Sequence, residues 1–222
     1  MSVLVFDLDG TLVSSMEDLA ATLNAVLIRA GYEAIEPDSV RNMVGQGAKV
    51  LLQRGLTANG VAWTEEQIVP LYQHFLDHYE AHLAVHTRPF PGVIEALDHF
   101  KAEGWRLAVC TNKVERLTVP LLEQLDLDKY FDAIVGGDTF AVPKPRAEPV
   151  LGAIERSGGT SAGSMMIGDS KTDIDAARAA GIPVIAVDFG YTPIPVTELG
   201  PDRVISHFNE LQAAIDDVRA MA

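Results

Sequence analysis

The sequence predicts an α/β protein: a Rossmann-like core built on a doubly wound parallel sheet, with an inserted all-helical cap domain. Over most of the chain, short apolar runs alternate with helical patterns, which is typical of strand–helix units in a parallel sheet. This alternation stops between residues 14 and 88, where only helical patterns occur. We therefore expect a discontinuous core, residues 1–13 and 89–222, interrupted by a helical cap domain at residues 14–88.

The core elements are expected in a regular order along the chain. Six apolar runs predict strands at Val3–Phe6, Arg106–Cys110, Ala133–Val135, Ser164–Ile167, Pro183–Val187 and Arg203–Ile205. Five helical patterns follow them at Val93–Glu103, Glu115–Leu125, Pro149–Arg156, Lys171–Ala180 and Asn209–Ala220. Pro120 lies within the second of these helices, where we expect it to start or kink a helical segment.

The inserted segment contains helical patterns at Met16–Ala30, Pro37–Arg54 and Thr64–Val85. Ser14 and Glu17 have the spacing of a capping box at the start of the first helix, and Gly31 is suited to end it. The segment HTRPFPG, residues 86–92, contains two prolines and suits the linker that returns to the core.

Composition narrows the classes of partner. The 222 residues carry a net charge of −14 and are 48% hydrophobic, so the chain can form one core and a small second domain. An acidic surface repels nucleic acid and anionic lipid, and we expect neither as a partner. The N-terminal apolar run is too short for a secretory signal. The single cysteine, Cys110, excludes an intrachain disulfide, which fits the cytoplasm. We also expect a monomer or homodimer.

Polar residues follow four of the predicted strands, at the edge where ligands bind in open parallel sheets. They are Asp7, Asp9, Gly10 and Thr11 after the first strand, Thr111 and Asn112 after the second, Lys144 in the loop beyond the third, and Asp169 and Asp173 after the fourth. Four carboxylates and one ammonium group leave a formal charge of −3. Such a cluster needs a cation, and carboxylate oxygens suit Mg²⁺. A phosphate oxygen could then bind the metal, with Lys144 and Thr111 holding the others.

These motifs resemble those of the haloacid dehalogenase superfamily, in its phosphatase branch. DLDGT matches the first motif of that family, Thr111 in VCTN the hydroxyl motif, Lys144 the lysine motif and GDSKTD the acidic motif. The four motifs occur in the family's order, and the helical insertion stands where its cap domain belongs. The resemblance covers essentially the whole chain and implies a Mg²⁺-dependent phosphomonoester hydrolase.

The resemblance also implies a role for each matching residue. Asp7 is the nucleophile that becomes an aspartyl-phosphate, and Asp9 is the general acid and base. The phosphoryl group is held by Thr111, Asn112 and Lys144. Mg²⁺ is bound by Asp7, by the backbone carbonyl of Asp9 and by Asp169, with Asp173 supporting the metal or Lys144. Gly10 permits the tight turn after the strand, and Thr11 orients Asp9.

Other interpretations of the motifs remain open at this point. Asp173 could form a capping box with Ser170 and have no other role. Haloacid dehalogenases and phosphonatases both lack the aspartate that stands here as Asp9. A phosphonatase also needs a lysine in the cap, where only Lys49 occurs. Phosphosugar mutases usually have Val or Ala in place of Thr11. The receiver domain, a phosphorylation switch of a different class, also has acids, a hydroxyl and a lysine at its strand ends. A further alternative is a relative of the family that binds its ligand without turnover.

The residues that indicate the identity of the substrate lie in the predicted cap. Residues 41–56, RNMVGQGAKVLLQRGL, resemble the cap loop of bacterial phosphoglycolate phosphatases, which implies 2-phosphoglycolate as the small phosphorylated metabolite. Arg41 and Gln46 are the candidate substrate contacts, with Gly45 and Gly47 allowing a close approach. Alternatives are an amino-sugar phosphate or pyrophosphate, or a plain helix-breaking turn with Gln46 facing solvent.

A row of histidines stands apart from these motifs. His74, His78, His82 and His86 recur at every fourth residue. This spacing can chelate a metal through adjacent pairs, but the row drifts by ~40° per step around a helix, so all four cannot face one ion. We expect a solvated or dimer-facing stripe.

Overall fold

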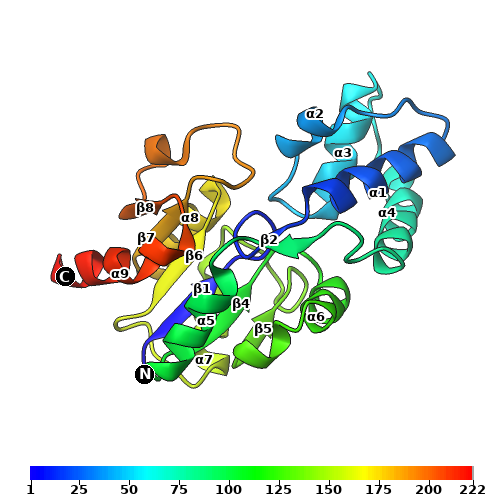
Figure 1. Ribbon diagram of the computed structural model, residues 1–222. Coiled ribbons are helices and arrows are strands. Elements are labelled where there is room, and N and C mark those ends of the chain that lie inside the picture. Colours follow the sequence, from blue (N-terminus) through cyan, green and yellow to red (C-terminus); the bar gives the residue numbers. More distant parts are fainter. Residues whose placement is uncertain (222) are drawn as a thin grey trace.

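The core of the computed structural model, which describes residues 1–221, is one parallel sheet of six strands (Figure 1). The strands are β1 (Val3–Phe6), β4 (Arg106–Cys110), β5 (Ala133–Val135), β6 (Met165–Gly168), β7 (Val184–Val187) and β8 (Arg203–Ile205). Their order is β5-β4-β1-β6-β7-β8. The central β1 pairs with β4 on one side and β6 on the other, so the chain winds in both directions from it. This confirms the predicted fold class and all six predicted strands, to within one residue at their ends.

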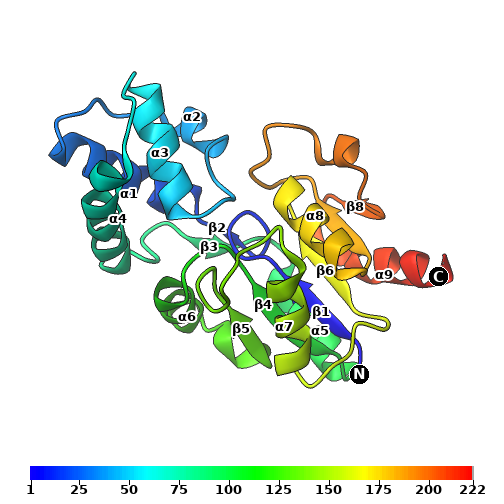
Figure 2. The same ribbon diagram turned by 180° about the vertical axis from the view of Figure 1, so that it is seen from behind.

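Helices cover both faces of the sheet (Figures 1 and 2). The core helices are α5 (Val93–Ala102), α6 (Glu115–Gln124), α7 (Ala147–Arg156), α8 (Lys171–Ala180) and α9 (Leu211–Ala220), with short 3₁₀ helices at Asp128–Tyr130, Val196–Leu199 and Phe208–Glu210. Alternate residues of β1 point to opposite faces. Phe6 therefore packs in one apolar cluster with Phe100 of α5, and Val5 in the other with Ile154 of α7. Pro120 lies inside α6 and does not begin the helix.

Four helices form the inserted segment: α1 (Met16–Arg29), α2 (Pro37–Arg41), α3 (Ala48–Ala58) and α4 (Glu65–Glu80). In both ribbon views these helices lie together beyond the carboxyl ends of the sheet strands (Figures 1 and 2). The chain leaves the core through β2 (Val13–Ser14) and returns through β3 (Arg88–Pro89), and these two short strands pair antiparallel. The predicted cap boundaries fall within this pair. The division into two domains itself stays a prediction.

The helix predicted at Pro37–Arg54 is wrong, because two helices occupy that part of the cap. Gly45 and Gly47 lie between them with φ of +103° and +84°, values that side chains other than glycine rarely adopt. These two glycines belong to the loop between α2 and α3, which approaches Asn112 of the core. The Ser14–Glu17 capping box is also absent, because Ser15 occupies the N-cap position of α1.

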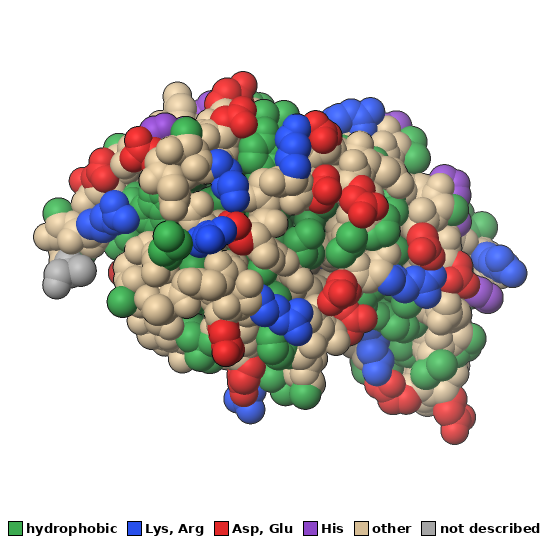
Figure 3. Space-filling model, turned by 90° about the horizontal axis from the view of Figure 1, so that it is seen from below, with side chains coloured by type: hydrophobic (Ala, Val, Ile, Leu, Met, Phe, Trp, Pro, Cys, Tyr) green, Lys and Arg blue, Asp and Glu red, His purple; other side chains and the backbone are tan. Residues whose placement is uncertain are grey.

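Charges of both signs are interspersed over the face shown in Figure 3. The excess of acidic residues is therefore not gathered into a single patch on that face. No helix among residues 1–221 is long and apolar enough to cross a membrane.

Candidate active site

Three buried carboxylates meet at the carboxyl end of the central strands. Asp7 follows β1, Asp169 follows the neighbouring β6, and Asp173 stands in the first turn of α8. One carboxylate oxygen from each residue lies within 4.8 Å of those of the other two. Within residues 1–221, no other three His, Cys, Asp or Glu side chains come together in this way. Burial raises the pKa of Asp7 to about 6 and the pKa of Asp169 well above its ordinary value. Buried carboxylates that crowd together favour a bound cation, and this donor set fits Mg²⁺.

Lys144 connects two of these carboxylates. Its Nζ lies 2.9 Å from Asp7 Oδ1 and 2.6 Å from Asp173 Oδ1. Burial by itself would lower the pKa of Lys144, but Asp173 and Asp7 raise it, so this lysine is an ammonium ion. Asp173 Oδ2 accepts hydrogen bonds from the backbone N–H and the hydroxyl of Ser170. The two interpretations of Asp173 therefore hold together: it caps α8 and also holds Lys144.

Asp169 is fixed from two sides. The Thr11 hydroxyl donates to Asp169 Oδ1 at 3.3 Å, and the Tyr191 N–H donates to Oδ2 at 2.6 Å. A side chain at Gly10 would place its Cβ 2.5 Å from Asp169 Oδ2, and the φ of Gly10 is +89°. Gly10 thus allows both the turn and the close approach of Asp169. Thr11 does not orient Asp9 as predicted, because its hydroxyl contacts Asp169.

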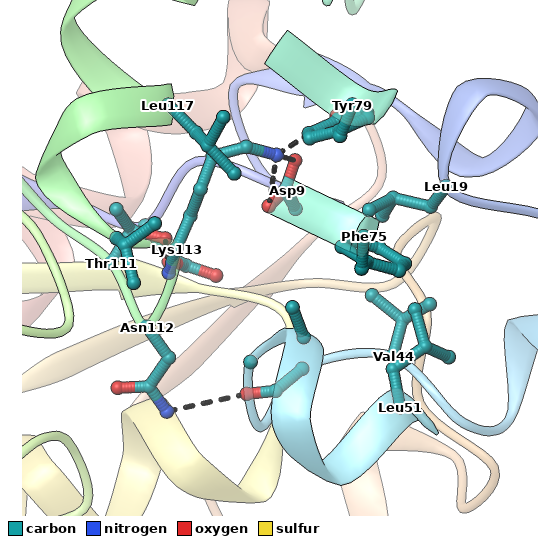
Figure 4. Close-up of a pocket in the computed structure, with 15 residues that line it drawn as sticks. Asp9, Leu19, Val44, Leu51, Phe75, Tyr79, Thr111, Asn112, Lys113 and Leu117 are labelled. Atoms are coloured by element: carbon teal, nitrogen blue, oxygen red, sulfur yellow. Dashed lines mark hydrogen bonds and ion pairs between the residues drawn. The ribbon is translucent and has the colours of Figure 1, made fainter. Parts of the chain in front are cut away.

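Asp9 is not part of the three-carboxylate group, and its contacts involve Ser15 and Lys113. Its Oδ1 accepts from the Ser15 hydroxyl at 2.6 Å, and the Lys113 ammonium lies 2.8 and 2.9 Å from its two oxygens. The same ammonium donates to the hydroxyl of Tyr79, in cap helix α4, at 2.9 Å. Figure 4 shows Lys113 reaching from the end of β4 to this pair.

Sequence reasoning missed Lys113, Ser15, Tyr79 and Tyr191. A signal existed for Lys113 alone, since it directly follows Thr111 and Asn112 at the end of a predicted strand. With Lys113 included, four carboxylates face two ammonium groups, and the formal charge of the site is −2. The predicted value of −3 is therefore wrong, although the net negative charge that calls for a cation remains.

The two polar residues after β4 have different surroundings. Thr111 is buried beside the end of β1 and lines the same pocket as Asp7. The Asn112 amide Nδ2 faces two carbonyls, Gly45 O at 3.4 Å and Lys144 O at 3.2 Å. Asn112 Oδ1 is buried without a partner among residues 1–221. Asn112 thus connects the cap loop to the lysine loop.

The structure does not bring the two predicted cap contacts into this pocket. Arg41 donates to Gly190 O at 2.7 Å and to Phe189 O at 3.2 Å, in a loop of the core. Gln46 is exposed, and its Oε1 accepts from Arg54 at 2.9 Å. Arg41 therefore connects cap to core, and Gln46 lies on the cap surface.

Cys110 and the histidine row have no part in the site. Burial raises the pKa of the Cys110 thiol to about 12, which suppresses the reactive thiolate. Helix α4 ends at Glu80, so His82 and His86 lie beyond it. The rings of His78 and His82 stack at 4.4 Å, and His82 Nδ1 contacts His78 O at 2.7 Å.

The pocket that contains Asp7 and Asp9 lies between core and cap. Figure 4 shows apolar cap side chains opposite the polar core residues. These cap residues are Leu19, Val44, Leu51 and Phe75. The space open to the centres of water-sized molecules is about 40 Å³, and one ordered water needs ~10–15 Å³ of such space. The pocket accordingly suits a small ligand.

Comparison with known proteins identifies the class that has this fold and site. The model of the haloacid dehalogenase-like hydrolase family matches residues 4–187, and the chain belongs to that family. Within that family, two similar relatives of this chain are named phosphoglycolate phosphatase. The phosphoglycolate phosphatase of Agrobacterium fabrum is 48% identical over 211 residues, covering 95% of this chain and 91% of the relative. That of Mesorhizobium japonicum is 44% identical and covers 94% and 92%.

Solved structures agree with this placement. The crystal structure of a predicted phosphoglycolate phosphatase from Haemophilus somnus has a TM-score of 0.90 and is 31% identical. The similarity covers 96% of this chain and 97% of that one. The whole arrangement of core and cap is therefore shared with a protein of known structure.

Proposed function

We propose that this protein is a Mg²⁺-dependent phosphomonoester hydrolase that acts on 2-phosphoglycolate through an aspartyl-phosphate intermediate. The observation that carries the proposal is the placement of Lys144 between Asp7 and Asp173, with Asp169 beside them. This arrangement offers a nucleophilic carboxylate, a cation for the phosphoryl oxygens and a metal site at one point.

The residues divide the work as follows. An Asp7 oxygen forms a bond to phosphorus while the bond from phosphorus to the ester oxygen breaks, and Asp9 supplies the proton to that oxygen. Asp9 then takes a proton from the water that hydrolyses the phosphorylated Asp7. Lys144 and Thr111 hold the phosphoryl oxygens. Asp7, Asp169 and the backbone carbonyl of Asp9 would hold Mg²⁺, which would offset the negative charge of the phosphoryl group.

The choice of 2-phosphoglycolate rests on the relatives named above and on the small pocket. An amino-sugar phosphate and pyrophosphate are the alternative substrates. A phosphosugar mutase is a weaker alternative, because this chain has Thr11 and its relatives are named as phosphatases. We further propose that the protein works in the cytoplasm, in keeping with its single buried cysteine, and that it is a monomer or homodimer.

A phosphate-release screen tests the proposal. Purified protein with Mg²⁺ is given a panel of small phosphomonoesters and pyrophosphate, and kcat/KM is measured for each. We expect continuous release, with the highest kcat/KM for 2-phosphoglycolate. A higher value for another phosphate refutes the substrate, and one equivalent of stable phosphorylation without turnover indicates a switch of the receiver type.

A further inference from the structure

Lys113 is a second buried lysine, and the steps described above do not use it. Its side chain is only 4% exposed. Burial by itself would lower the pKa of Lys113, but Asp9 and Tyr79 raise it. Its ammonium group also lies 4.4 Å from the centre of the Tyr79 ring. The cation is thus enclosed between one carboxylate of the core and one aromatic residue of the cap.

This contact occupies the side chain that is to transfer protons. Both oxygens of Asp9 accept from Lys113, and Oδ1 also accepts from Ser15. A general acid needs an oxygen directed at the leaving group. Asp9 must therefore give up part of its contact with Lys113 before it can act.

Releasing Asp9 leaves Lys113 without its counter-ion. A buried ammonium that loses its partner is strongly destabilised, because its charge is then left without a counter-ion and away from water. The exchange becomes easy only when another anion takes the place of Asp9. Lys144 is not free for that anion, because Asp7 and Asp173 take two of its three N–H donors and the phosphoryl group takes the third. Lys113 and Asp9 line the same pocket as Asp7, so a substrate bound at Asp7 shares its pocket with Lys113.

We propose that Lys113 is a specificity-determining residue, which exchanges Asp9 for a second anionic group of the substrate and so frees Asp9 for proton transfer. The inference rests on the proposed function, in which that group is the carboxylate of 2-phosphoglycolate. Tyr79 is a positioning residue that holds Lys113 at the cap side of the pocket. The exchange is one of ion pairs only, and no covalent bond changes in it.

The test compares two substrates that differ only at this group. Ethyl phosphate has a methyl group where 2-phosphoglycolate has its carboxylate. In Lys113→Met we expect kcat/KM for 2-phosphoglycolate to fall by about 100-fold or more, as for a lost partner in a buried charge pair. For ethyl phosphate we expect kcat/KM to rise, because that substrate cannot replace Asp9 at Lys113 and the substitution removes the ion pair that holds Asp9. Equal losses for both substrates indicate a merely structural role and overturn the proposal.

Tyr79→Phe is the matched variant for the positioning role. It keeps the aromatic ring and removes only the hydroxyl that contacts Lys113. We expect a smaller loss, about 10-fold, confined to 2-phosphoglycolate, at the low end of the range for one hydrogen bond to a charged group. A loss of the same size for ethyl phosphate contradicts the positioning role.

A second measurement covers the case in which Lys113→Met does not fold. Methyl phosphate and formate together carry the two groups of 2-phosphoglycolate on separate molecules. In the wild-type protein we expect formate to raise kcat/KM for methyl phosphate saturably, while chloride at equal ionic strength does not. In that case the absence of any formate effect overturns the proposal.

The outcomes for the two proposals can be separated. Wild-type kinetics across the panel decide the substrate, whereas the ratio of losses in Lys113→Met decides the role of Lys113. If the wild-type protein prefers another dianionic or carboxylated phosphate, the substrate assignment fails. The same comparison is then made between that substrate and its analogue without the second anion.

Discussion

Lys144 Nζ lies 2.6 Å from Asp173 Oδ1, while Asp173 Oδ2 caps the first turn of helix α8 through Ser170. One carboxylate thus fixes both the start of a helix and the position of a buried lysine at the site. The second contact of Lys144, to Asp7, therefore depends on where α8 begins.

Asp173→Asn separates these two duties. The amide oxygen can still cap α8, but its NH₂ group then faces the Lys144 ammonium, so we expect kcat/KM to fall by about 100-fold. Ser170→Ala is the control, since it removes only the hydroxyl contact at the same cap. It should lower the free energy of unfolding by about 0.5–2 kcal/mol, with kcat/KM within about 3-fold of wild type. Similar activity losses in both variants would mean that Asp173 matters only as a cap.

Asp7→Asn and Asp9→Asn should fail in different ways. The first removes the nucleophile, so activity falls to background and no covalent intermediate forms. The second keeps Asp7 but removes proton transfer, a step typically worth ~10²–10⁴-fold. With an aryl phosphate, whose leaving group needs little protonation, phosphorylated Asp7 should accumulate in Asp9→Asn. Acid quench and mass spectrometry should find one added HPO₃ group. Finding that group on another residue would contradict the assignment.

Activity should depend on a divalent cation, because the four carboxylates of the site outnumber its two ammonium groups. We expect protein stripped with EDTA to be nearly inactive and Mg²⁺ to restore it. Phosphate release is measured before and after metal addition, with Ca²⁺, a larger ion of the same charge, as a control for size. Full activity after rigorous stripping contradicts the metal assignment.

The stability of the metal-free protein should fall as pH rises from about 4 to above 6. Burial raises the pKa of Asp7 from 3.8 to about 6, and it raises the pKa of Asp169 as well. In this window the native state binds more protons than the unfolded state, so the free energy of unfolding decreases with pH. Urea unfolding at about pH 5 and about pH 7.5 checks the sign. Asp7→Asn should flatten this dependence, and Mg²⁺ should restore stability at the higher pH.

Gln46→Ala should leave substrate preference nearly unchanged. The Gln46 side chain is exposed and bonded to Arg54, and an exposed hydrogen bond contributes only ~0.5–1.5 kcal/mol to stability. We expect the ratio of kcat/KM between 2-phosphoglycolate and an aryl phosphate to stay within about 2-fold of wild type. A change of about 10-fold or more, the size of a lost substrate contact, would show that Gln46 turns into the pocket when substrate binds.

The sequence by itself determined the strands of the sheet and placed the reactive residues at the carboxyl ends of those strands. Apolar runs and helical patterns were enough for this, because burial in a parallel sheet requires them at regular spacing. Asp7, Thr111 and Asp169 each directly follow a strand. Since the strands are parallel and adjacent, their carboxyl ends bring these residues together irrespective of the side-chain conformations.

Only the tertiary structure decided the contacts that cross from core to cap. Lys113 meets Tyr79 across 34 residues of chain, and Arg41 meets Gly190 across 149. No periodicity encodes such pairs, because they depend on how the cap helices pack and on which rotamer each long side chain adopts. The direction of the Thr11 hydroxyl, toward Asp169 and away from Asp9, was decided in the same way. Local pattern thus fixes where a strand ends, whereas packing of distant segments decides which partner a side chain reaches.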